Sequence, residues 1–210
     1  GDMAQGDLAA VMPHRPDGIC LPKAEGMASI RALAALMGDA PCAIFPLVTE
    51  TPLAMFRLGE YAGASERICG LTWGAEDLPA AIGATRARNP DGTFTPPLEL
   101  ARSLTLFSAH AAGVEAIETI SPDFKDLDAL RRYAERAAAD GFTGMMAIHP
   151  AQVPVINAAF TPSPETVAHA RRIIEAFAAA PDAGVLSIDG QMIDAPHLKQ
   201  AQRTLARAGL

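Results

Sequence analysis

The sequence lacks several features that identify membrane, secreted or nucleic-acid-binding proteins. No apolar run approaches the roughly 18 residues that a membrane-spanning helix needs. The first residues contain no secretory signal, with its charged start, apolar stretch and cleavage site. The 17 lysines and arginines are scattered and the formal net charge is −7, whereas nucleic-acid binding needs clustered positive charge. We therefore expect a cytoplasmic protein with no nucleic-acid or membrane partner.

Cysteine is scarce too. Cys20, Cys42 and Cys69 lie far apart and form no C-x-x-C pair. This spacing argues against a disulfide framework and a cysteine zinc site, and it indicates buried structural thiols in a reducing compartment. The G-x-S-x-G, Walker and G-x-G-x-x-G patterns are also absent, which argues against a hydrolase triad, a P-loop and a Rossmann nucleotide site.

The sequence does contain a repeated strand–helix rhythm. Five short apolar runs recur, and each is followed by a longer stretch with helical spacing. Continuous apolar runs, rather than alternating ones, are typical of parallel strands buried on both faces. We therefore predict an α/β fold with a parallel sheet or barrel. The predicted strands are residues 18–21, 43–48, 68–72, 114–117 and 145–148.

Apolar stripes at helical spacing and helix-end residues support the helices between these runs. Thr51 followed by Pro52 is typical of a helix start, and Gly141 of a helix end. Residues 85–97 form one long irregular loop. The stripes are Ile30, Leu33, Ala34 and Met37; Leu98, Ala101, Leu104 and Ala111; and Leu127, Leu130, Ala134 and Ala137.

The strand–helix rhythm stops near residue 159. A breaker cluster at 160–164 precedes a predicted helix at 164–179, an extended piece at 184–188 and a last helix after Asp194. We therefore divide the chain into a (β/α) region, residues 1–159, and a C-terminal extension, residues 160–210. A closed eight-stranded barrel takes about 250 residues, so five units predict either an open sheet or a barrel whose first strands precede residue 1.

Polar residues follow the predicted strands, at the end where ligands bind in parallel α/β folds. Glu50 and Asp77 follow the second and third strands and form a natural pair for Mg²⁺, which takes one or two carboxylates. Alternatively, both are helix N-terminal acids favoured by the helix dipole. Lys23 is a candidate Schiff-base nucleophile, although pairing with Glu25 or an anionic ligand is the favoured interpretation. His149 is a candidate base, but a role in ordering its loop is favoured.

Six segments, in order along essentially the whole chain, resemble motifs of the HpcH/HpaI aldolase and citrate lyase beta-subunit-like family. The last two resemble its acyl-CoA lyase branch. Six linked motifs are a specific signal where any one would be weak. DGICLPKAE (17–25) is similar to the family's DGIxLPKxE, LVTET (47–51) to LIET, and GLTWGAEDL (70–78) to GLxFGAEDL. GFTGMMAIHPAQ (141–152) is similar to GFxGKxxIHPxQ, FTPS (160–163) to FTPS, and GQMIDAP (190–196) to GxMIDxP.

The resemblance implies a TIM (β/α)₈ barrel of the phosphoenolpyruvate/pyruvate type, of which this chain holds strands four to eight plus a C-terminal helical extension. It implies a Mg²⁺-dependent carbon–carbon lyase that cleaves or forms a 3-hydroxyacyl-CoA such as citryl-, malyl- or citramalyl-CoA. The products of cleavage are a keto acid and an acyl-CoA. Some members behave as thioesterases. The family's first three strands, which we do not find in this sequence, normally supply an acidic strand end and a substrate-binding arginine.

Residue by residue, Glu50 and Asp77 match the family's Mg²⁺ ligands, with coenzyme A entering as part of the substrate. Asp194 matches the catalytic aspartate that reaches a neighbouring subunit's active site, so we expect the extension to cover such a site in a homotrimer or homohexamer. Substrate binding is expected of four residues in the same motifs, namely Lys23, Gly74, Ala75 and Glu76.

Two departures from the family pattern leave the substrate range open. Met145 stands where many members have lysine, and Glu118 stands where many have aspartate. Two other functions also stay open. A metal-dependent pyruvate aldolase would act without coenzyme A, although such aldolases generally lack the GxMIDxP tail. A non-catalytic fragment or regulatory subunit would account for the strands that are not found.

Overall fold

The computed structural model describes residues 3–210, and the chain divides into two compact units, Gly1–Ile156 and Asn157–Leu210. The boundary between the units lies three residues before the one predicted from the breaker cluster at 160–164. Within residues 3–210, no helix is both long and apolar enough to cross a membrane.

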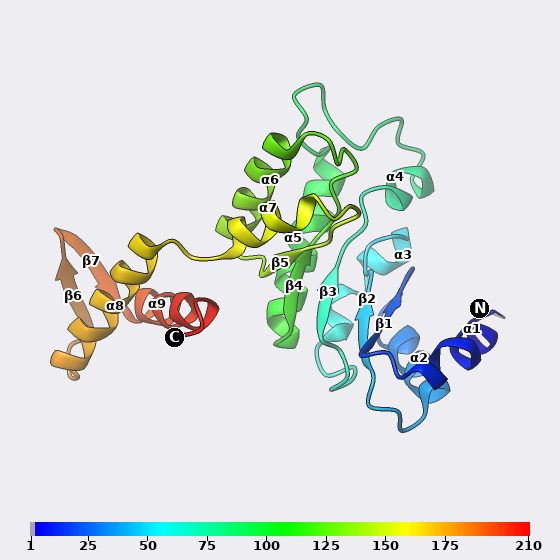
Figure 1. Ribbon diagram of the computed structural model, residues 1–210, viewed down its shortest axis with the longest axis horizontal. Helices are drawn as coiled ribbons and strands as arrows, with labels where there is room; N and C mark the ends of the chain where they lie inside the picture. Colours follow the sequence, from blue (N-terminus) through cyan, green and yellow to red (C-terminus); the bar gives the residue numbers. More distant parts are fainter. Residues whose placement is uncertain (1–2) are drawn as a thin grey trace. The chain divides into compact units, whose positions relative to one another are not determined.

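The first unit is built on five short parallel strands, which confirms the predicted α/β class (Figure 1). β1 pairs with β2, and β3, β4 and β5 pair in chain order. Isolated parallel bridges from Ile44 to Ile68 and from Leu47 to Thr72 join β2 to β3. The strands are β1 (Gly18–Leu21), β2 (Ala43–Pro46), β3 (Gly70–Thr72), β4 (Glu115–Glu118) and β5 (Gly144–Met145).

This arrangement is the strand order of a (β/α) barrel, in which each strand lies beside the next one along the chain. β1 and β5 lie at the two ends of the series, and they do not pair with each other in the part of the chain that the structure describes. The described strands therefore form an open segment of such a barrel, as the count of five units predicted.

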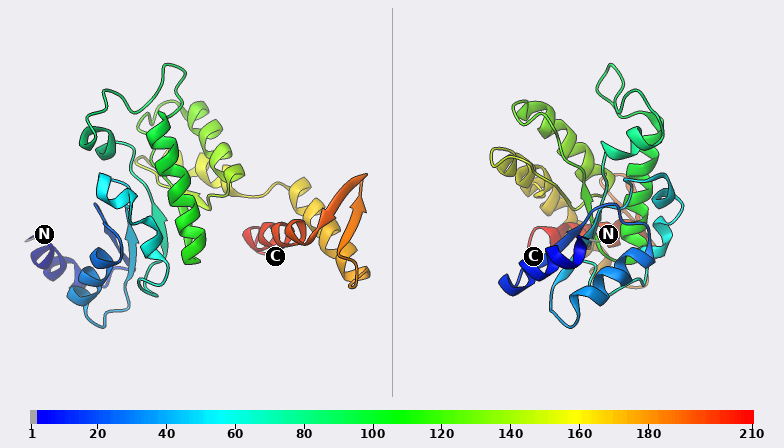
Figure 2. Two further views of the ribbon diagram at one scale, coloured as in Figure 1. Left: turned by 180° about the vertical axis from the view of Figure 1, so that it is seen from behind. Right: turned by 90° about the vertical axis from the view of Figure 1, so that its right-hand side faces the viewer.

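Helices follow the strands and surround the sheet of the first unit (Figure 2). Short 3₁₀ helices at Met12–His14 and Leu58–Tyr61 add single turns. The α-helices are α1 (Ala4–Val11), α2 (Met27–Met37), α3 (Pro52–Met55), α4 (Asp77–Ala81), α5 (Pro96–Ala112), α6 (Leu127–Asp140) and α7 (Gln152–Phe160), the last of which continues into the second unit.

The helix ends agree with the residues that predicted them. Thr51 is the N-cap of α3, and its hydroxyl accepts the Ala54 N–H at 3.2 Å. Gly141 ends α6 in the left-handed conformation, with φ of 109°, which a residue with a Cβ adopts only at a cost. A cap satisfies helix N–H groups that otherwise have no intrahelical partner, so these two residues fix where their helices begin and end.

One predicted stripe was partly wrong. Ala111, assigned to the buried face of α5, is exposed. The buried face of α5 also carries three polar side chains, those of Arg102, Thr105 and Ser108. The buried residues are therefore not the purely apolar set that was predicted. The buried arginine has a specific partner, described below.

The prediction of buried structural thiols was wrong for two of the three cysteines. Cys42 is buried, but Cys20 and Cys69 are exposed, and all three are free. Although Cys20 is exposed, partial desolvation of its thiol is the largest cause that raises its pKa, followed by the nearby Glu50 carboxylate and the Cys69 thiol. Cys20 is on β1, the first strand of the open sheet, and its side chain therefore lacks the cover that strands on both sides would give.

The second unit is a small α/β assembly rather than a purely helical extension. Helix α8 (Pro164–Ala179) is followed by the antiparallel hairpin β6 (Val185–Ile188) and β7 (Gln191–Asp194), and then by α9 (Ala195–Arg207). Asp189 and Gly190, with φ of 52° and 79°, form the two-residue turn of the hairpin. The core consists of Ala170, Ile173, Ile193 and Ala201, with Ile174, Phe177, Ile188 and Leu205 packed against it.

Candidate functional site

Three predicted site residues meet at the carboxyl ends of neighbouring strands. Lys23 follows β1, Glu50 follows β2 and Asp77 follows β3. The Lys23 Nζ lies 2.9 Å from the Asp77 Oδ1, and the Lys23 backbone N–H donates to the Glu50 Oε2 at 2.5 Å. The structure thus brings together one ammonium and two carboxylates that are far apart in the sequence. We call these three residues the strand-end cluster.

The backbone at Lys23 is bent to make this contact. Lys23 adopts φ of 51°, a left-handed conformation that costs a residue with a side chain about 1 kcal/mol or more. The next amide, that of Ala24, donates to the Leu47 carbonyl at 3.1 Å, so the turn after β1 is tied to the end of β2. The left-handed turn therefore aims the Lys23 amide at Glu50.

Glu50 is held closely from the side of β3. A Cβ added to Gly74 would lie 3.1 Å from the Glu50 Cγ, a tight contact that would push the Glu50 side chain from its position. The fully buried Thr49 hydroxyl accepts the Gly74 N–H at 3.1 Å. These contacts fix the Glu50 carboxylate beside the segment that carries Asp77, and Glu50 itself is only 8% exposed.

The electrostatics of the cluster favour an additional cation. Burial raises the pKa of Glu50; the Lys23 amide lowers it, and the nearby Asp77 carboxylate raises it again. Hydrogen bonding to Asp77 raises the pKa of Lys23. Within residues 3–210, no group of three or more histidine, cysteine, aspartate or glutamate side chains could hold a metal. A metal at this cluster would therefore have two protein carboxylates and take its other ligands from water or substrate, as Mg²⁺ does.

The remaining residues of the GLTWGAEDL segment (70–78) line the same edge. Ala75 is buried, Glu76 is exposed and Asp77 is half-buried. Glu76 is the N-cap of α4 and Asp77 is its first residue, so Asp77 also satisfies the alternative prediction of a helix N-terminal acid. The two interpretations are compatible, because the carboxylate faces Lys23 from that position.

The expected Lys23–Glu25 pair is not formed. The Glu25 carboxylate instead accepts the Thr51 hydroxyl at 2.7 Å. Lys23 pairs with Asp77 because its left-handed backbone turns the chain toward β2 and β3. The buried Tyr61 hydroxyl donates to the Ala24 carbonyl at 3.0 Å and accepts the Gly26 N–H at 3.1 Å, which holds the turn between these residues.

A buried charged network supports the GLTWGAEDL segment from the next strand. Glu118, fully buried at the end of β4, accepts the Trp73 indole N–H at 2.5 Å and the Thr119 N–H at 2.8 Å. Its other oxygen accepts the Arg102 Nε at 2.6 Å, and Arg102 continues to Asp140 at 2.7 Å. Glu118 was singled out as a departure from the family pattern, whereas Arg102 was not predicted to be a site residue. Position 102 is four residues after Leu98, so it falls on the predicted inner face of α5. A charged residue on that face could have indicated a buried ion pair.

The segment after β5 is ordered by its own side chains. The His149 ring stacks on Phe124, with ring centroids 4.8 Å apart, and its Nδ1 accepts the Ala151 N–H at 3.1 Å. The fully buried Gln152 accepts the Ile148 N–H at 2.9 Å and donates to the Ser121 carbonyl at 3.0 Å. His149 therefore orders its loop, as was favoured over a role as a base. Met145 is buried, with 9% exposure.

Asp194 belongs to the second unit and makes its contacts there. It is the last residue of β7 and the N-cap of α9, and its side chain is 32% exposed. Its Oδ1 lies 2.6 Å from the Nδ1 of His197. The strand-end cluster and Asp194 are thus features of separate units.

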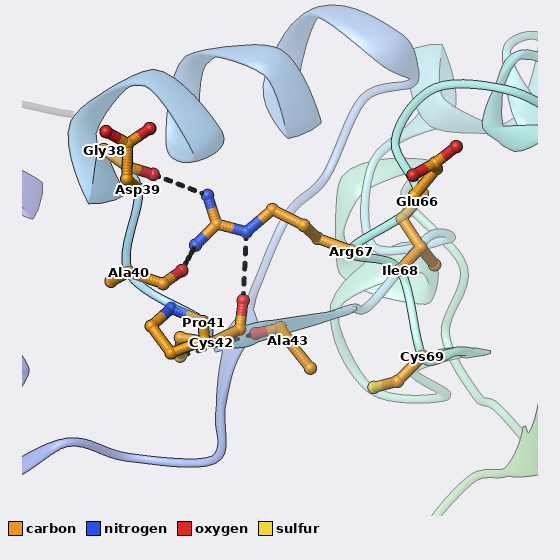
Figure 3. A pocket seen from close by; sticks show the side chains of 10 residues that line it. All are labelled: Gly38, Asp39, Ala40, Pro41, Cys42, Ala43, Glu66, Arg67, Ile68 and Cys69. Carbon is orange, nitrogen blue, oxygen red and sulfur yellow. Dashed lines mark hydrogen bonds between the residues drawn. The ribbon is translucent and has the colours of Figure 1, made fainter.

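A hollow of about 560 Å³ lies at the opposite, amino-terminal ends of β2 and β3 (Figure 3). Its centre is Arg67, whose guanidinium donates to the carbonyl oxygens of Gly38, Ala40 and Cys42. These bonds satisfy carbonyls beyond the end of α2 and occupy all three guanidinium nitrogens. The hollow is therefore explained as a structural feature.

Comparison with known protein families gives two overlapping matches. Residues 2–150 match the family described as HpcH/HpaI aldolase/citrate lyase. Residues 98–210 match the family described as C–C bond lyase of the TIM-barrel fold.

Several curated relatives are similar over nearly the whole chain. The citrate lyase subunit beta-like protein of Mycobacterium tuberculosis is 36% identical over 97% of this chain and 71% of its own length. The (3S)-malyl-CoA thioesterase of Cereibacter sphaeroides is 34% identical over 99% of this chain and 70% of its own length. The mitochondrial citramalyl-CoA lyase of Mus musculus is 34% identical over 98% of this chain and 65% of its own length.

Solved structures agree with the sequence matches. The crystal structure of protein CitE from Mycobacterium tuberculosis, in complex with magnesium, acetoacetate and coenzyme A, superposes with a TM-score of 0.81 and 34% identity. The match covers 98% of this chain and 73% of that one.

Proposed function

Because the chain belongs to the HpcH/HpaI aldolase/citrate lyase family, we propose that it is a Mg²⁺-dependent carbon–carbon lyase. The proposed substrate is a 3-hydroxyacyl-CoA such as citryl-, malyl- or citramalyl-CoA, which is cleaved into a keto acid and an acyl-CoA or formed from them. The observation that carries the proposal is the meeting of Lys23, Glu50 and Asp77 at three neighbouring strand ends. The similarity to a structure that holds magnesium, acetoacetate and coenzyme A supports it.

The strand-end cluster fits a hard divalent cation. Glu50 and Asp77 offer carboxylate oxygens, the ligands that Mg²⁺ prefers. Burial is the largest cause that raises the pKa of Glu50, and the nearby Asp77 carboxylate raises it further. The Lys23 ammonium already lies 2.9 Å from Asp77, so the cluster attracts positive charge. When bound there, Mg²⁺ supplies a Lewis acid for the keto-acid oxygens.

Cleavage requires the net movement of one proton. The bond between the carbinol carbon and the thioester α-carbon breaks, the hydroxyl proton leaves to a base, and the carbinol becomes the keto group. The electron pair of the broken bond moves into the thioester as an enolate, which needs electrostatic stabilisation. The α-carbon then accepts one proton. Asp194 is the proposed donor of that proton.

The other predicted residues have supporting roles in this proposal. The Lys23 ammonium balances the negative charge of the bound keto acid, and Gly74, Ala75 and Glu76 line the edge on which the substrate lies. The C-terminal extension, residues 160–210, carries Asp194 to the active site of a neighbouring subunit in a homotrimer or homohexamer. Three free cysteines support a reducing, cytoplasmic location.

The test is product analysis with the purified protein, Mg²⁺ and each of citryl-, malyl- and citramalyl-CoA. A lyase gives equal amounts of keto acid and acyl-CoA, both measurable by mass spectrometry. A thioesterase, the second candidate favoured by the Cereibacter relative, gives free coenzyme A and the hydroxy acid. The expected result is keto acid formation that chelator abolishes. Absence of both reactions with all three thioesters would contradict the proposal and favour a non-catalytic subunit.

Three substitutions test the assignment of roles. Glu50→Gln and Asp77→Asn are expected to abolish Mg²⁺-dependent cleavage, because each removes one of two protein carboxylates. Asp194→Asn is expected to abolish the same reaction without loss of Mg²⁺ binding. Full lyase activity in Asp194→Asn would show that the proton comes from another group.

A further inference from the structure

The side chain of His197 makes an unusually close contact with Asp194. The His197 Nδ1 and the Asp194 Oδ1 are 2.6 Å apart, and the two residues stand at the third helical position and the N-cap of α9. Their side chains are 42% and 32% exposed, respectively. Here the helix start holds both partners in place.

The contact is a hydrogen bond in the ring tautomer that carries its proton on Nδ1. A carboxylate oxygen is an acceptor, and an unprotonated imidazole nitrogen is an acceptor too, so two such atoms repel at 2.6 Å. In that tautomer the His197 ring donates to the Asp194 carboxylate. Charge-assisted hydrogen bonds of this kind are short and strong.

Helix capping alone does not call for a donor at this position. In a capping box, the residue three positions after the N-cap is usually glutamate or glutamine, whose side-chain oxygen accepts the N-cap N–H. The His197 Nδ1 is 3.3 Å from the Asp194 amide nitrogen and can serve that purpose only when it carries no proton. The Asp194 side chain in turn accepts the His197 backbone N–H, which completes the capping box. The 2.6 Å contact between the two side chains is an addition to that box, and it acts on the Asp194 carboxylate.

The surroundings of Asp194 also favour a working carboxylate over a purely structural one. Asp194 pairs across the hairpin with Val185, and the neighbouring pair on the same face is Met192 with Ser187. Val185 and Met192 are 56% and 64% exposed. This face of the hairpin thus presents one carboxylate between two exposed apolar side chains, a suitable surface for covering a substrate.

We infer that His197 is a positioning residue for Asp194. Its Nδ1–H holds the carboxylate in one orientation and stabilises the anion that remains after Asp194 has given its proton to the substrate carbon. In the reverse direction the same bond orients the carboxylate that takes the proton. The inference rests on the proposed role of Asp194, and it adds a residue that the motif GxMIDxP does not include.

Three variants of His197 separate positioning from capping. His197→Glu keeps an acceptor for the Asp194 amide but has no proton for the carboxylate. His197→Gln keeps an acceptor and an amide donor, and His197→Ala keeps neither. The readouts are kcat and KM for thioester cleavage, together with the midpoint of thermal unfolding.

The expected result is a loss in kcat of about 10- to 100-fold in His197→Glu, with unchanged KM and a midpoint near that of the wild type. His197→Gln is expected to recover part of kcat, and His197→Ala is expected to lose both kcat and stability. A wild-type kcat in His197→Glu would overturn the inference, because capping alone would then explain His197. Long-range ¹⁵N–¹H NMR of the His197 ring gives an independent check, with a proton on Nδ1 expected and a bare Nδ1 contradictory.

Failure of the inference and failure of the proposed function give different results. If the wild type cleaves no thioester, the proposed function fails first. If the wild type is active and Asp194→Asn is equally active, the role of Asp194 fails. An inactive Asp194→Asn combined with a fully active His197→Glu refutes the positioning role of His197 by itself, as does a bare Nδ1 in the NMR measurement.

Discussion

Removing one partner of the buried ion pair between Arg102 and Glu118 should strongly destabilise the first unit. Arg102 is 3% exposed and Glu118 is fully buried, with the Arg102 Nε 2.6 Å from the Glu118 Oε2. Burial lowers the pKa of Arg102, but the Glu118 and Asp140 carboxylates outweigh this and raise it above its usual range, so the guanidinium stays charged. Arg102→Met leaves the Glu118 charge buried with only two neutral donors, from Trp73 and Thr119.

We therefore expect Arg102→Met to lower the free energy of unfolding by about 3–5 kcal/mol, the range observed when one partner of a buried pair is removed. Urea denaturation followed by tryptophan fluorescence measures this, because Trp73 is the only tryptophan in the sequence and touches the network. Adding Glu118→Gln to Arg102→Met should restore about 2 kcal/mol, since glutamine keeps the acceptor for Trp73 and Thr119 without the charge.

A matched control is Arg131→Met, which removes an exposed arginine paired with Asp128 on α6 and should cost less than about 0.5 kcal/mol. The reasoning would be refuted if Arg102→Met cost less than about 1 kcal/mol, or if Glu118→Gln restored nothing in its background. Either result would mean that water or a rearranged donor neutralises the buried carboxylate.

Three other predictions follow from the same structure. Gly74→Ala should weaken Mg²⁺ binding about tenfold in calorimetry, because its Cβ would lie 3.1 Å from the Glu50 Cγ and displace that carboxylate; unchanged affinity would contradict the close-approach argument. Lys23→Met should raise the KM for the thioester without weakening Mg²⁺ binding, because the ammonium competes with the metal for Asp77; weaker Mg²⁺ binding would contradict this. Burial raises the pKa of Tyr61 to about 12, so its neutral form stabilises the fold fully below about pH 10, and that contribution is lost as the pH rises toward 12. The decline in unfolding free energy over this range should be smaller in Tyr61→Phe than in the wild type, and an equal decline would refute the assignment.

Much of the fold could be predicted because its signals are local. Four strands coincide with the predicted apolar runs to within two residues, whereas β5 shares only Met145 with the predicted run at 145–148. The starts of α3 and α8 were marked by Thr51-Pro52 and by the serine and proline at 163–164. The hairpin β6–β7 was missed although Asp189-Gly190 is a strong two-residue turn signal. The extended piece predicted at 184–188 corresponds to β6, and the second strand of the hairpin, β7, was not predicted.

The candidate site was predictable in its residues and not in its contacts. Parallel strand ends meet at one edge, so Glu50 and Asp77 were expected together. The predicted pairing of Lys23 with Glu25 was wrong. Lys23 adopts a left-handed backbone conformation, which a sequence does not reliably predict for a residue other than glycine. Arg102 was missed for a related reason. A charged residue on an apolar stripe can be interpreted only when its partner is known. The partner of Arg102 is Glu118, which lies 16 residues later on the next strand.

The most direct test of the central claim is a calorimetric titration of the purified protein with Mg²⁺, compared with Glu50→Gln, Asp77→Asn and the exposed control Asp128→Asn. The account predicts one Mg²⁺ site in the wild type and in Asp128→Asn, with binding lost or severely weakened in Glu50→Gln and Asp77→Asn. Equal Mg²⁺ binding in all four proteins, or no binding in the wild type, would contradict the assignment of the strand-end cluster as the metal site.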